Sequence, residues 1–481
     1  MSAGVIFTCF IVYSALLFLI TWFTSRGADN QSYFLGNKNS PWYVVAYGMI
    51  GASLSGVTFM SVPGWVGTTQ FSYMVMVLGY FAGYLVIAGV LLPLYYRLNL
   101  TSIYSYLEQR FGFWSYKTGA FFFLLSRTVG ASFRMFLVVN VLQIFIFDQW
   151  GVPFAVTVLI FIVLIILYTF EGGIKTIVWT DTLQTTFMLL GVGISFYLIA
   201  KELDLSVFKL SSNIFHSDYS QVLFTDINDK RHFVKQFLAG MFITITMTGL
   251  DQEMMQKNLS CKSLKEAQKN MLTYSGIIVF VNLLFLALGA ALYMYISHKG
   301  IDMPLKTDDL FATIAIKHLG PFAGLVFIIG LISAAYPSAD GALTSLTTSF
   351  CVDFLGMDKK VSDATQKRKR YLVHFSFAAL LLLVIVIFRA INDQAVIGKL
   401  FTVAGYTYGP LLGLFAFGLF VKAKVKDNWV PLICVLSPIV CYFLNEYSVQ
   451  IFNGYKFGFE LLILNGLLTF IGLALVNEKA K

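Results

Sequence analysis

The segment Ser333-Ala334-Ala335-Tyr336-Pro337-Ser338-Ala339-Asp340-Gly341 lies in the middle of an apolar run that covers about residues 319–350. It brings a proline, a carboxylate and two serines into otherwise aliphatic surroundings. Such groups cost free energy at membrane depth, and interrupted spans of this kind usually line an ion or solute site. The segment therefore predicts a broken membrane-spanning helix, with a functional site at the break.

The composition of the whole chain agrees with a membrane protein. Of its 481 residues, 58% are hydrophobic and only 12% are charged, whereas a soluble domain carries about 25% charged residues. A transmembrane barrel is excluded because its strands would alternate apolar and polar residues. Since a helix crosses the bilayer in about 20 residues, we expect an all-α polytopic membrane protein with about 13 transmembrane helices. They cover about residues 5–25, 42–67, 73–96, 118–147, 153–170, 176–200, 234–252, 271–297, 319–350, 371–391, 396–421, 428–446 and 458–476.

The basic residues predict how the chain sits in a cytoplasmic (inner) membrane. The first apolar run has no basic residues before it and no small-residue cleavage site after it, so it is a span and not a signal peptide. Lys and Arg are concentrated in every second loop, for example at Lys257, Lys262 and Lys265. This asymmetry predicts an outside N-terminus and a cytoplasmic C-terminus. It also accounts for the net charge of +9, so no nucleic-acid partner is expected.

The organisation predicted is a single transmembrane domain over residues 1–481. Glycine, serine and threonine interrupt two spans near their middles, at Tyr47–Thr58 and Gly240–Gly249. These spans are five apart in the predicted order, as an inverted five-helix repeat would place its two broken helices. Repeat one would cover about 42–200 and repeat two about 234–421. Peripheral helices would lie at 5–25, 428–446 and 458–476, and a short amphipathic helix on the outer surface within 201–235.

Three groups of residues are candidates for a site. An unwound turn between Gly51 and Thr58 would expose carbonyl oxygens, the hard ligands that an alkali cation prefers; the alternative is close helix packing through small residues. Near Pro337, the carboxylate of Asp340 lies beside hydroxyl residues and suits a sodium or proton site. Asp181 enters another span, where it either completes a second cation site or binds a helix N-terminus.

These residues belong to motifs that resemble the sodium:solute symporter family. The motifs are Ser55-Gly56-Val57-Thr58-Phe59-Met60-Ser61-Val62-Pro63, Trp179-Thr180-Asp181 with Gln184, Leu100–Phe111, Asp251–Lys257 and Gly409–Leu414. They cover about residues 40–425 in the order found in the family. The resemblance implies a LeuT-like inverted five-helix repeat with one extra N-terminal helix, and sodium-driven uptake by alternating access.

The resemblance also implies ligands for sodium. Backbone oxygens of Gly51 and Leu54 would form one half of the principal site, and Ala334 and Ser338 the other. Pro337 stands where many members have a second hydroxyl. Asp181 matches the aspartate of a second sodium site found in some members, and Asp340 and Gly341 replace the serines of that site. These replacements imply either a tighter sodium site or proton sensitivity, because two nearby carboxylates resist ionising together.

Candidates for solute binding surround the first predicted break: Ser53, Ser55, Thr58 and Tyr73. Arg127 and Arg134 are seven residues apart on one helical face and either pair with a solute carboxylate or pair with Asp181, Asp340 or lipid phosphate. Sialic-acid transporters of the family carry an arginine that aligns with Gly130, and some sugar transporters a glutamine that aligns with Val77, so neither substrate is implied.

The function expected is a sodium-coupled symporter that imports a small hydrophilic solute, namely a sugar, polyol, organic anion or amino acid. Its ligands would be the solute, the sodium ion and the lipid bilayer, with no obligate protein partner evident. A solute sensor without net flux and a proton-coupled carrier are the alternatives. An enzyme is not expected, because the histidines fall mostly at span ends or in loops and no nucleophile–base pair or metal cluster is evident.

Overall fold

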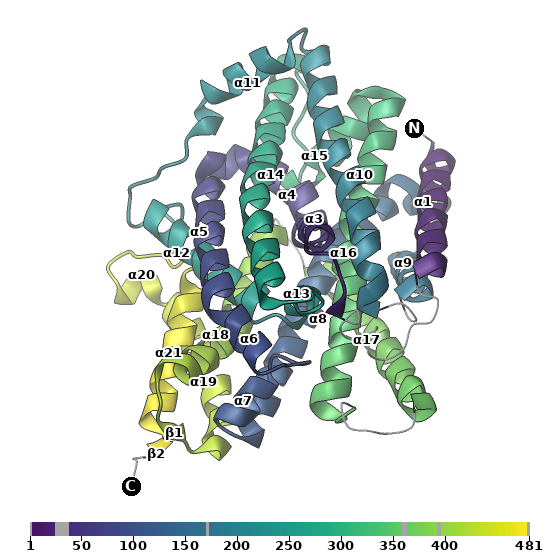
Figure 1. The fold of residues 1–481 in the computed structure, drawn as a ribbon. Coiled ribbons are helices and arrows are strands. Elements are labelled where there is room, and N and C mark those ends of the chain that lie inside the picture. The colour runs from purple at the N-terminus through teal and green to yellow at the C-terminus, as the bar shows by residue number, and fades with distance from the viewer. Residues whose placement is uncertain (1, 25–37, 170–172, 358–362, 392–395, 479–481) are drawn as a thin grey trace.

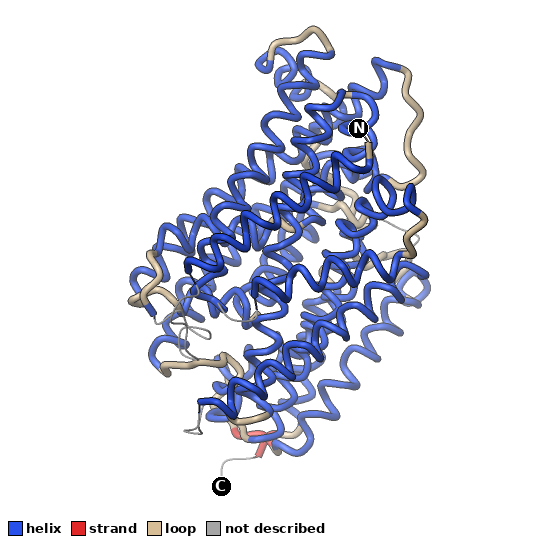
Figure 2. The backbone as a smooth tube through the Cα atoms, turned by 90° about the vertical axis from the view of Figure 1, so that its right-hand side faces the viewer, coloured by secondary structure: helices blue, strands red, loops and turns tan. Residues whose placement is uncertain are grey.

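The computed structural model describes residues 2–24, 38–169, 173–357, 363–391 and 396–478. Within these ranges the chain forms a bundle of long helices, and Figures 1 and 2 show that most of them run between the same two ends of the molecule. The N-terminal helix begins near the upper end in Figure 1, and the C-terminus lies at the lower end. The predicted all-α fold is therefore confirmed.

The helices of the N-terminal half are α1 (Ala3–Thr24), α3 (Trp42–Ser53), α4 (Gly56–Thr69), α5 (Tyr73–Val86), α6 (Leu92–Arg97), α7 (Ser105–Arg110), α8 (Phe113–Leu142), α9 (Phe154–Thr169), α10 (Gly173–Glu202) and α11 (Val207–Phe215). The C-terminal half contains α12 (Phe233–Thr244), α13 (Gln252–Leu259), α14 (Leu264–Lys299), α15 (Leu310–Thr313), α16 (Gly320–Ser349), α17 (Asp363–Ile391), α18 (Val396–Phe420), α19 (Val430–Glu446), α20 (Ser448–Ile451) and α21 (Leu461–Leu475). One antiparallel pair joins β1 (Lys424–Val425) to β2 (Asn477–Glu478).

Every predicted span contains a helix in the structure. Among the described residues, nine helical segments are long and apolar enough to cross a membrane, and a bent pair is the tenth; α9 and α21 are apolar but shorter. One of the nine runs from Gly56 to Arg97 and turns at Gln70, whose φ of 53° is not helical. The exact count of thirteen spans stays a prediction.

The first broken helix is α3–α4, where the sequence predicted it. Helix α3 ends at Ser53, and Leu54 leaves the helical region with ψ at 75°. Ser55 then caps α4 because its hydroxyl accepts a hydrogen bond from the backbone N–H of Val57. The two halves are thus separated by two residues, and carbonyl groups in the last turn of α3 have no intrahelical donor.

The second broken helix is α12–α13, and its break lies just beyond the predicted Gly240–Gly249. The two halves are bent by 65° at Leu250 and Asp251. Asp251 caps α13 by accepting hydrogen bonds from the N–H groups of Glu253 and Met254, at 3.0 and 3.2 Å. Tyrosine hydroxyls satisfy carbonyls freed at the bend, since Tyr95 donates to Gly249 and Tyr104 to Leu250. The inverted repeat itself stays a prediction.

The predicted break at Ser333–Gly341 is wrong. Helix α16 runs without interruption from Gly320 to Ser349, with Pro337 inside it and all nine residues of the segment buried. A proline removes only one helical hydrogen bond, and the Ser333 hydroxyl donates to the carbonyl of Ile329 one turn earlier. The same hydroxyl oxygen lies 2.8 Å from the hydroxyl oxygen of Tyr13 on α1. Close packing on every side therefore holds the segment helical despite its polar groups.

One smaller prediction can be compared with the structure. The amphipathic helix expected within 201–235 forms as α11, which buries Leu210 and Ile214 and leaves Phe208 and Phe215 exposed.

Candidate functional site

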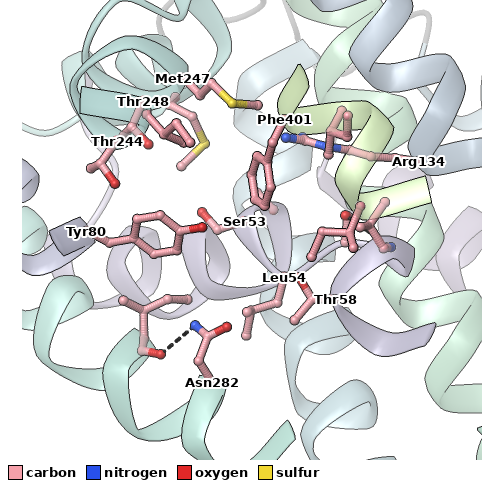
Figure 3. A pocket seen from close by; sticks show the side chains of 18 of the residues that line it. Ser53, Leu54, Thr58, Tyr80, Arg134, Thr244, Met247, Thr248, Asn282 and Phe401 are labelled. Carbon is pink, nitrogen blue, oxygen red and sulfur yellow. Dashed lines mark hydrogen bonds between the residues drawn. The ribbon is translucent and has the colours of Figure 1, made fainter. Parts of the chain in front are cut away.

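A cavity of about 90 Å³ lies beside the break between α3 and α4. All six residues expected to bind solute line it: Ser53, Ser55, Thr58, Tyr73, Arg127 and Arg134. They come from the end of α3, the break itself, α4, α5 and α8, so the cavity brings together residues that are far apart in the sequence. Figure 3 shows Ser53, Leu54 and Thr58 on one side of the cavity, and Tyr80, Arg134 and Phe401 around it.

Hydrogen bonds between hydroxyl groups form one wall of this cavity. Ser53 bonds to the hydroxyl of Tyr274, which also lies 2.8 Å from the hydroxyl of Tyr84. Tyr73 and Tyr80 bond to each other through hydroxyls 3.1 Å apart. A hydroxyl can donate as well as accept, so this wall can bind an oxygen-rich solute without a fixed charge.

Arg134 supplies a positive charge to the cavity. It is half-buried on α8, its buried Nε has no hydrogen-bond partner among the described residues, and no described carboxylate lies within ion-pair distance. A guanidinium in such a place favours an anionic ligand, since it presents a rigid fork of donors that matches a carboxylate. Arg134 is thus available to a solute.

Arg127 also faces the cavity but is already paired. It forms an ion pair with Glu253 and lies 3.9 Å from a carboxylate oxygen of Asp251. These partners belong to the second broken helix and differ from the Asp181 and Asp340 considered from the sequence. Arg127 therefore links α8 to the break between α12 and α13.

The six predicted sodium ligands come from three neighbouring helices and the first break. Gly51 lies on α3 and Leu54 at the break; Asp181 lies on α10; and α16 carries Ala334, Ser338 and Asp340. Helix α10 packs against both α3 and α16. The N–H of Gly51 donates to the Thr185 hydroxyl of α10 at 3.0 Å, so the two helices touch directly at this level.

Two oxygen atoms of the predicted sodium ligands are buried without a hydrogen-bond partner among the described residues. They are the hydroxyl oxygen of Ser338 and Oδ1 of Asp181. Buried polar atoms are normally hydrogen-bonded, and an exception calls for an explanation such as a bound ion. Both oxygens are hard donors and fit an alkali cation.

The prediction that Lys257 lies in a cytoplasmic loop is wrong. It is 1% exposed on α13, with Nζ 2.7 Å from Oδ2 of Asp181 and 3.4 Å from Oε1 of Glu253. The reason is the 65° bend, which turns α13 into the bundle and buries its charged residues. Hydropathy alone predicts a loop for a charged segment of this kind. The signal in the sequence was the motif Asp251–Lys257, where three acidic or basic residues recur at two- and four-residue spacing.

A second, larger cavity of about 390 Å³ shares Tyr73 and Phe401 with the first. Lys230 and Phe459 also line it. Lys230 lies in a segment that the sequence predicts outside the membrane, and Phe459 at the start of the predicted span 458–476. Tyr73 and Phe401 thus form part of the wall of both cavities. The sequence did not single out Phe401, nor the cavity residues Tyr80, Tyr84 and Asn282, because aromatic and amide residues carry no distinctive spacing there.

Known proteins of similar sequence are sodium-coupled transporters. The model of the sodium:solute symporter family matches residues 33–427. A sodium/sialic acid symporter of Proteus mirabilis is 24% identical over 88% of this chain and 87% of its own length. Sodium-coupled monocarboxylate transporter 1 of Mus musculus is 24% identical over 87% of this chain and 69% of its own length.

Solved structures agree with the fold. The substrate-bound, outward-open structure of a Na⁺-coupled sialic acid symporter superimposes with a TM-score of 0.83 over 99% of both chains, at 20% identity. The closed structure of Mhp1, a nucleobase-cation-symport-1 family transporter, gives a TM-score of 0.56 over 92% of this chain and 93% of its own, at 14% identity. The predicted LeuT-like fold is confirmed. By its sequence match over most of its length, the chain belongs to the sodium:solute symporter family, as its motifs predicted.

Proposed function

We propose that the protein imports a small organic anion bearing a carboxylate, together with Na⁺, across the cytoplasmic membrane. Family membership makes the chain a sodium-coupled solute transporter and not an enzyme. The observation that carries the choice of solute is Arg134, a half-buried guanidinium that lines the cavity and has no described carboxylate within ion-pair distance. Among the solute classes considered from the sequence, sugars and polyols have no group that would neutralise this charge.

The size of the cavity supports a small acid. Its volume of about 90 Å³ is well below the roughly 300–1,000 Å³ of typical drug-sized ligand pockets. Monocarboxylates such as pyruvate or lactate present one carboxylate and one further oxygen. Arg134 would bind the carboxylate, and the hydroxyls of Ser53, Thr58 and Tyr73 would bind the other oxygen.

The relatives give this proposal independent support. Among them are symporters named for sialic acid and for monocarboxylates, and both of these solutes carry a carboxylate. The two kinds of relative differ in solute size, and the small cavity of this chain favours the monocarboxylate over the bulky sugar acid.

Sodium would bind where α3, α10 and α16 meet. The carbonyls of Gly51, Leu54 and Ala334 and the Ser338 hydroxyl would coordinate it, with Asp181 and Asp340 providing negative charge nearby. The unpartnered oxygens of Ser338 and Asp181 support this assignment.

Uptake into proteoliposomes tests the solute class. Radiolabelled pyruvate, lactate, sialic acid, glucose and proline would be compared in the presence of Na⁺. We expect pyruvate and lactate to be accumulated, and Arg134→Gln to raise the KM for the accepted acid about 10- to 100-fold. This range corresponds to the loss of about 1.5–3 kcal/mol from a charged hydrogen bond.

Two variants serve as controls for that experiment. Arg134→Lys keeps the positive charge but lacks the planar fork of donors, so its KM should lie between those of the wild type and Arg134→Gln. Arg97→Gln, at an exposed position, should have the KM of the wild type. Preferred uptake of glucose or proline, or an unchanged KM in Arg134→Gln, would contradict the proposed solute class.

We infer from the loop charges that the N-terminus faces outward and the C-terminus faces the cytoplasm. Cysteines placed at Lys456 and Lys424, in a Cys9→Ser background that leaves only buried native thiols, test this orientation in intact cells. An impermeant maleimide should label Lys456→Cys and leave Lys424→Cys unlabelled. The reverse pattern would contradict the orientation.

A further inference from the structure

Four buried side chains of alternating charge connect the solute cavity to the predicted sodium region. Arg127, in the wall of the cavity, pairs with Glu253. Glu253 lies 3.4 Å from Lys257, and Lys257 lies 2.7 Å from Asp181. The exposed fraction is 4% for Arg127 and at most 1% for the other three. We refer to these four residues as the charge relay.

The relay joins three helices at the second break. Glu253 and Lys257 are one turn apart on α13, so their side chains lie on the same face, while α8 and α10 supply the two ends. Gly341 of α16 makes room for the carboxylate, because a Cβ atom at this position would collide with Glu253. The position that replaces a serine of the family's second sodium site is therefore filled here by a carboxylate from α13.

Each inner member of the relay has to serve two partners. The carboxylate of Glu253 is shared between Arg127 and Lys257, and the ammonium of Lys257 between Glu253 and Asp181. Removing one partner from a buried ion pair is strongly destabilising, since it leaves an uncompensated charge. A new charge at either end will therefore shift the pairing along the whole relay instead of leaving one member unpaired.

The direction of that shift favours symport. A solute carboxylate that binds Arg127 beside Arg134 weakens the ion pair between Arg127 and Glu253. Glu253 then attracts Lys257 more strongly. Asp181 loses part of its partner, and its carboxylate becomes a better ligand for Na⁺. In the reverse sense, Na⁺ at Asp181 releases Lys257 toward Glu253, and Arg127 becomes available to the solute.

We propose that the relay Arg127–Glu253–Lys257–Asp181 couples the binding of the solute anion to the binding of Na⁺. Glu253 and Lys257 are positioning residues, which act through the charges at the two ends and touch neither ligand. The proposal rests on the proposed uptake of a carboxylate with Na⁺. It predicts a coupling factor that is reciprocal, because each ligand must change the affinity of the other equally.

Equilibrium binding to purified full-length protein in nanodiscs measures this factor. The Kd for ²²Na⁺ would be determined without pyruvate and with saturating pyruvate, and the Kd for pyruvate with and without Na⁺. In the wild type we expect both affinities to rise by the same factor, within the roughly 5- to 150-fold range typical of coupled sites. In Glu253→Gln we expect a factor near one, while Na⁺ alone and pyruvate alone still bind.

Matched variants separate coupling from folding. Glu108→Gln removes an exposed carboxylate and should keep the wild-type factor, and Lys257→Arg preserves the charge sequence and should keep most of it. If Glu253→Gln elutes as aggregate, Glu253→Asp replaces it. The shorter side chain keeps its negative charge but places the carboxylate farther from both Arg127 and Lys257. The coupling factor of Glu253→Asp should be several-fold smaller than that of the wild type.

The outcomes distinguish this proposal from the proposed function. Pyruvate that binds the wild type equally well with and without Na⁺ would contradict sodium-coupled pyruvate uptake, and with it the relay. A wild type that shows coupling, together with a folded Glu253→Gln or Glu253→Asp that shows the same factor, would overturn the relay alone.

Discussion

At the scale of single residues, three buried polar atoms without a hydrogen-bond partner among the described residues lie where the ligands are proposed to bind. Nε of Arg134 lies at the cavity, and the oxygens of Ser338 and Asp181 lie where α10 and α16 meet α3. Water alone would satisfy such atoms in a soluble protein, but their position here between broken and intact spans favours a solute and an ion. The proposed anion would therefore bind in the cavity, and the proposed cation where α3, α10 and α16 meet.

Removal of the Ser338 hydroxyl tests the sodium assignment. Ser338→Ala deletes one proposed ligand, so we expect the Na⁺ concentration for half-maximal uptake to rise about tenfold, which is about 1.4 kcal/mol. Ser345→Ala is the matched control on the same helix, since its hydroxyl already donates to Ala342 at 3.0 Å. Equal sodium dependence in the wild type and both variants would refute Ser338 as a ligand.

The sequence predicted the cavity residues better than the ion pairs. Ser53, Thr58 and Arg134 were found because glycines and hydroxyls in an apolar run, or arginines on one face of a span, are conspicuous. Glu253 and Lys257 were missed because their burial depends on the bend of α13. A bend is a tertiary feature, and hydropathy averaged over a window places charged residues beyond it in a loop.

At the scale of elements, the glycines of α5 and α12 allow these helices to approach closely. A Cβ atom on Gly79 would collide with the backbone of Phe237, and one on Gly240 with the backbone of Met76. Small residues permit such contacts between membrane helices, which pack by van der Waals interactions and not by a hydrophobic driving force. For Gly240 at least, close packing explains the glycine better than an interrupted helix does.

A pair of glycine variants tests this packing. Gly240→Ala should lower the stability by about 1–3 kcal/mol because the backbone of α5 cannot move aside. A Cβ atom at Gly276 on α14 would meet no atom within 4 Å. Gly276→Ala should therefore raise the stability by about 0.5–1 kcal/mol, since alanine favours the helix. Thermal denaturation followed by size-exclusion chromatography would show the difference, and a Gly240→Ala variant as stable as Gly276→Ala would contradict it.

The elements also show where pattern reasoning reaches its limit. Polar residues near the middle of a span suggested a break at three places, and two of the three spans are broken. Helix α16 contains a proline and still continues, because its neighbours bury it on all sides, and this packing offsets a proline cost of about 3 kcal/mol or more. The break in α12–α13 lies at Asp251, a strong N-cap residue, and not among the preceding threonines.

At the scale of the whole molecule, composition and motifs were sufficient to predict the class. Long apolar runs require helices that span a membrane, and ordered motifs over most of the chain identified the family. The solute could not be predicted from those features, because it depends on how side chains from α3, α4, α5, α8, α12, α13, α14 and α18 line one cavity. Cavity size and an available guanidinium are properties of the folded chain alone.

The most direct test of the central claim is pyruvate accumulation driven by a sodium gradient. Purified protein in proteoliposomes would take up labelled pyruvate with Na⁺ or choline outside, and with or without a sodium ionophore. We predict transient accumulation above the external concentration with Na⁺ only, and its loss when the ionophore removes the gradient. Accumulation that is equal in choline, or that follows a proton gradient in the absence of Na⁺, would contradict sodium-coupled import of a small carboxylate.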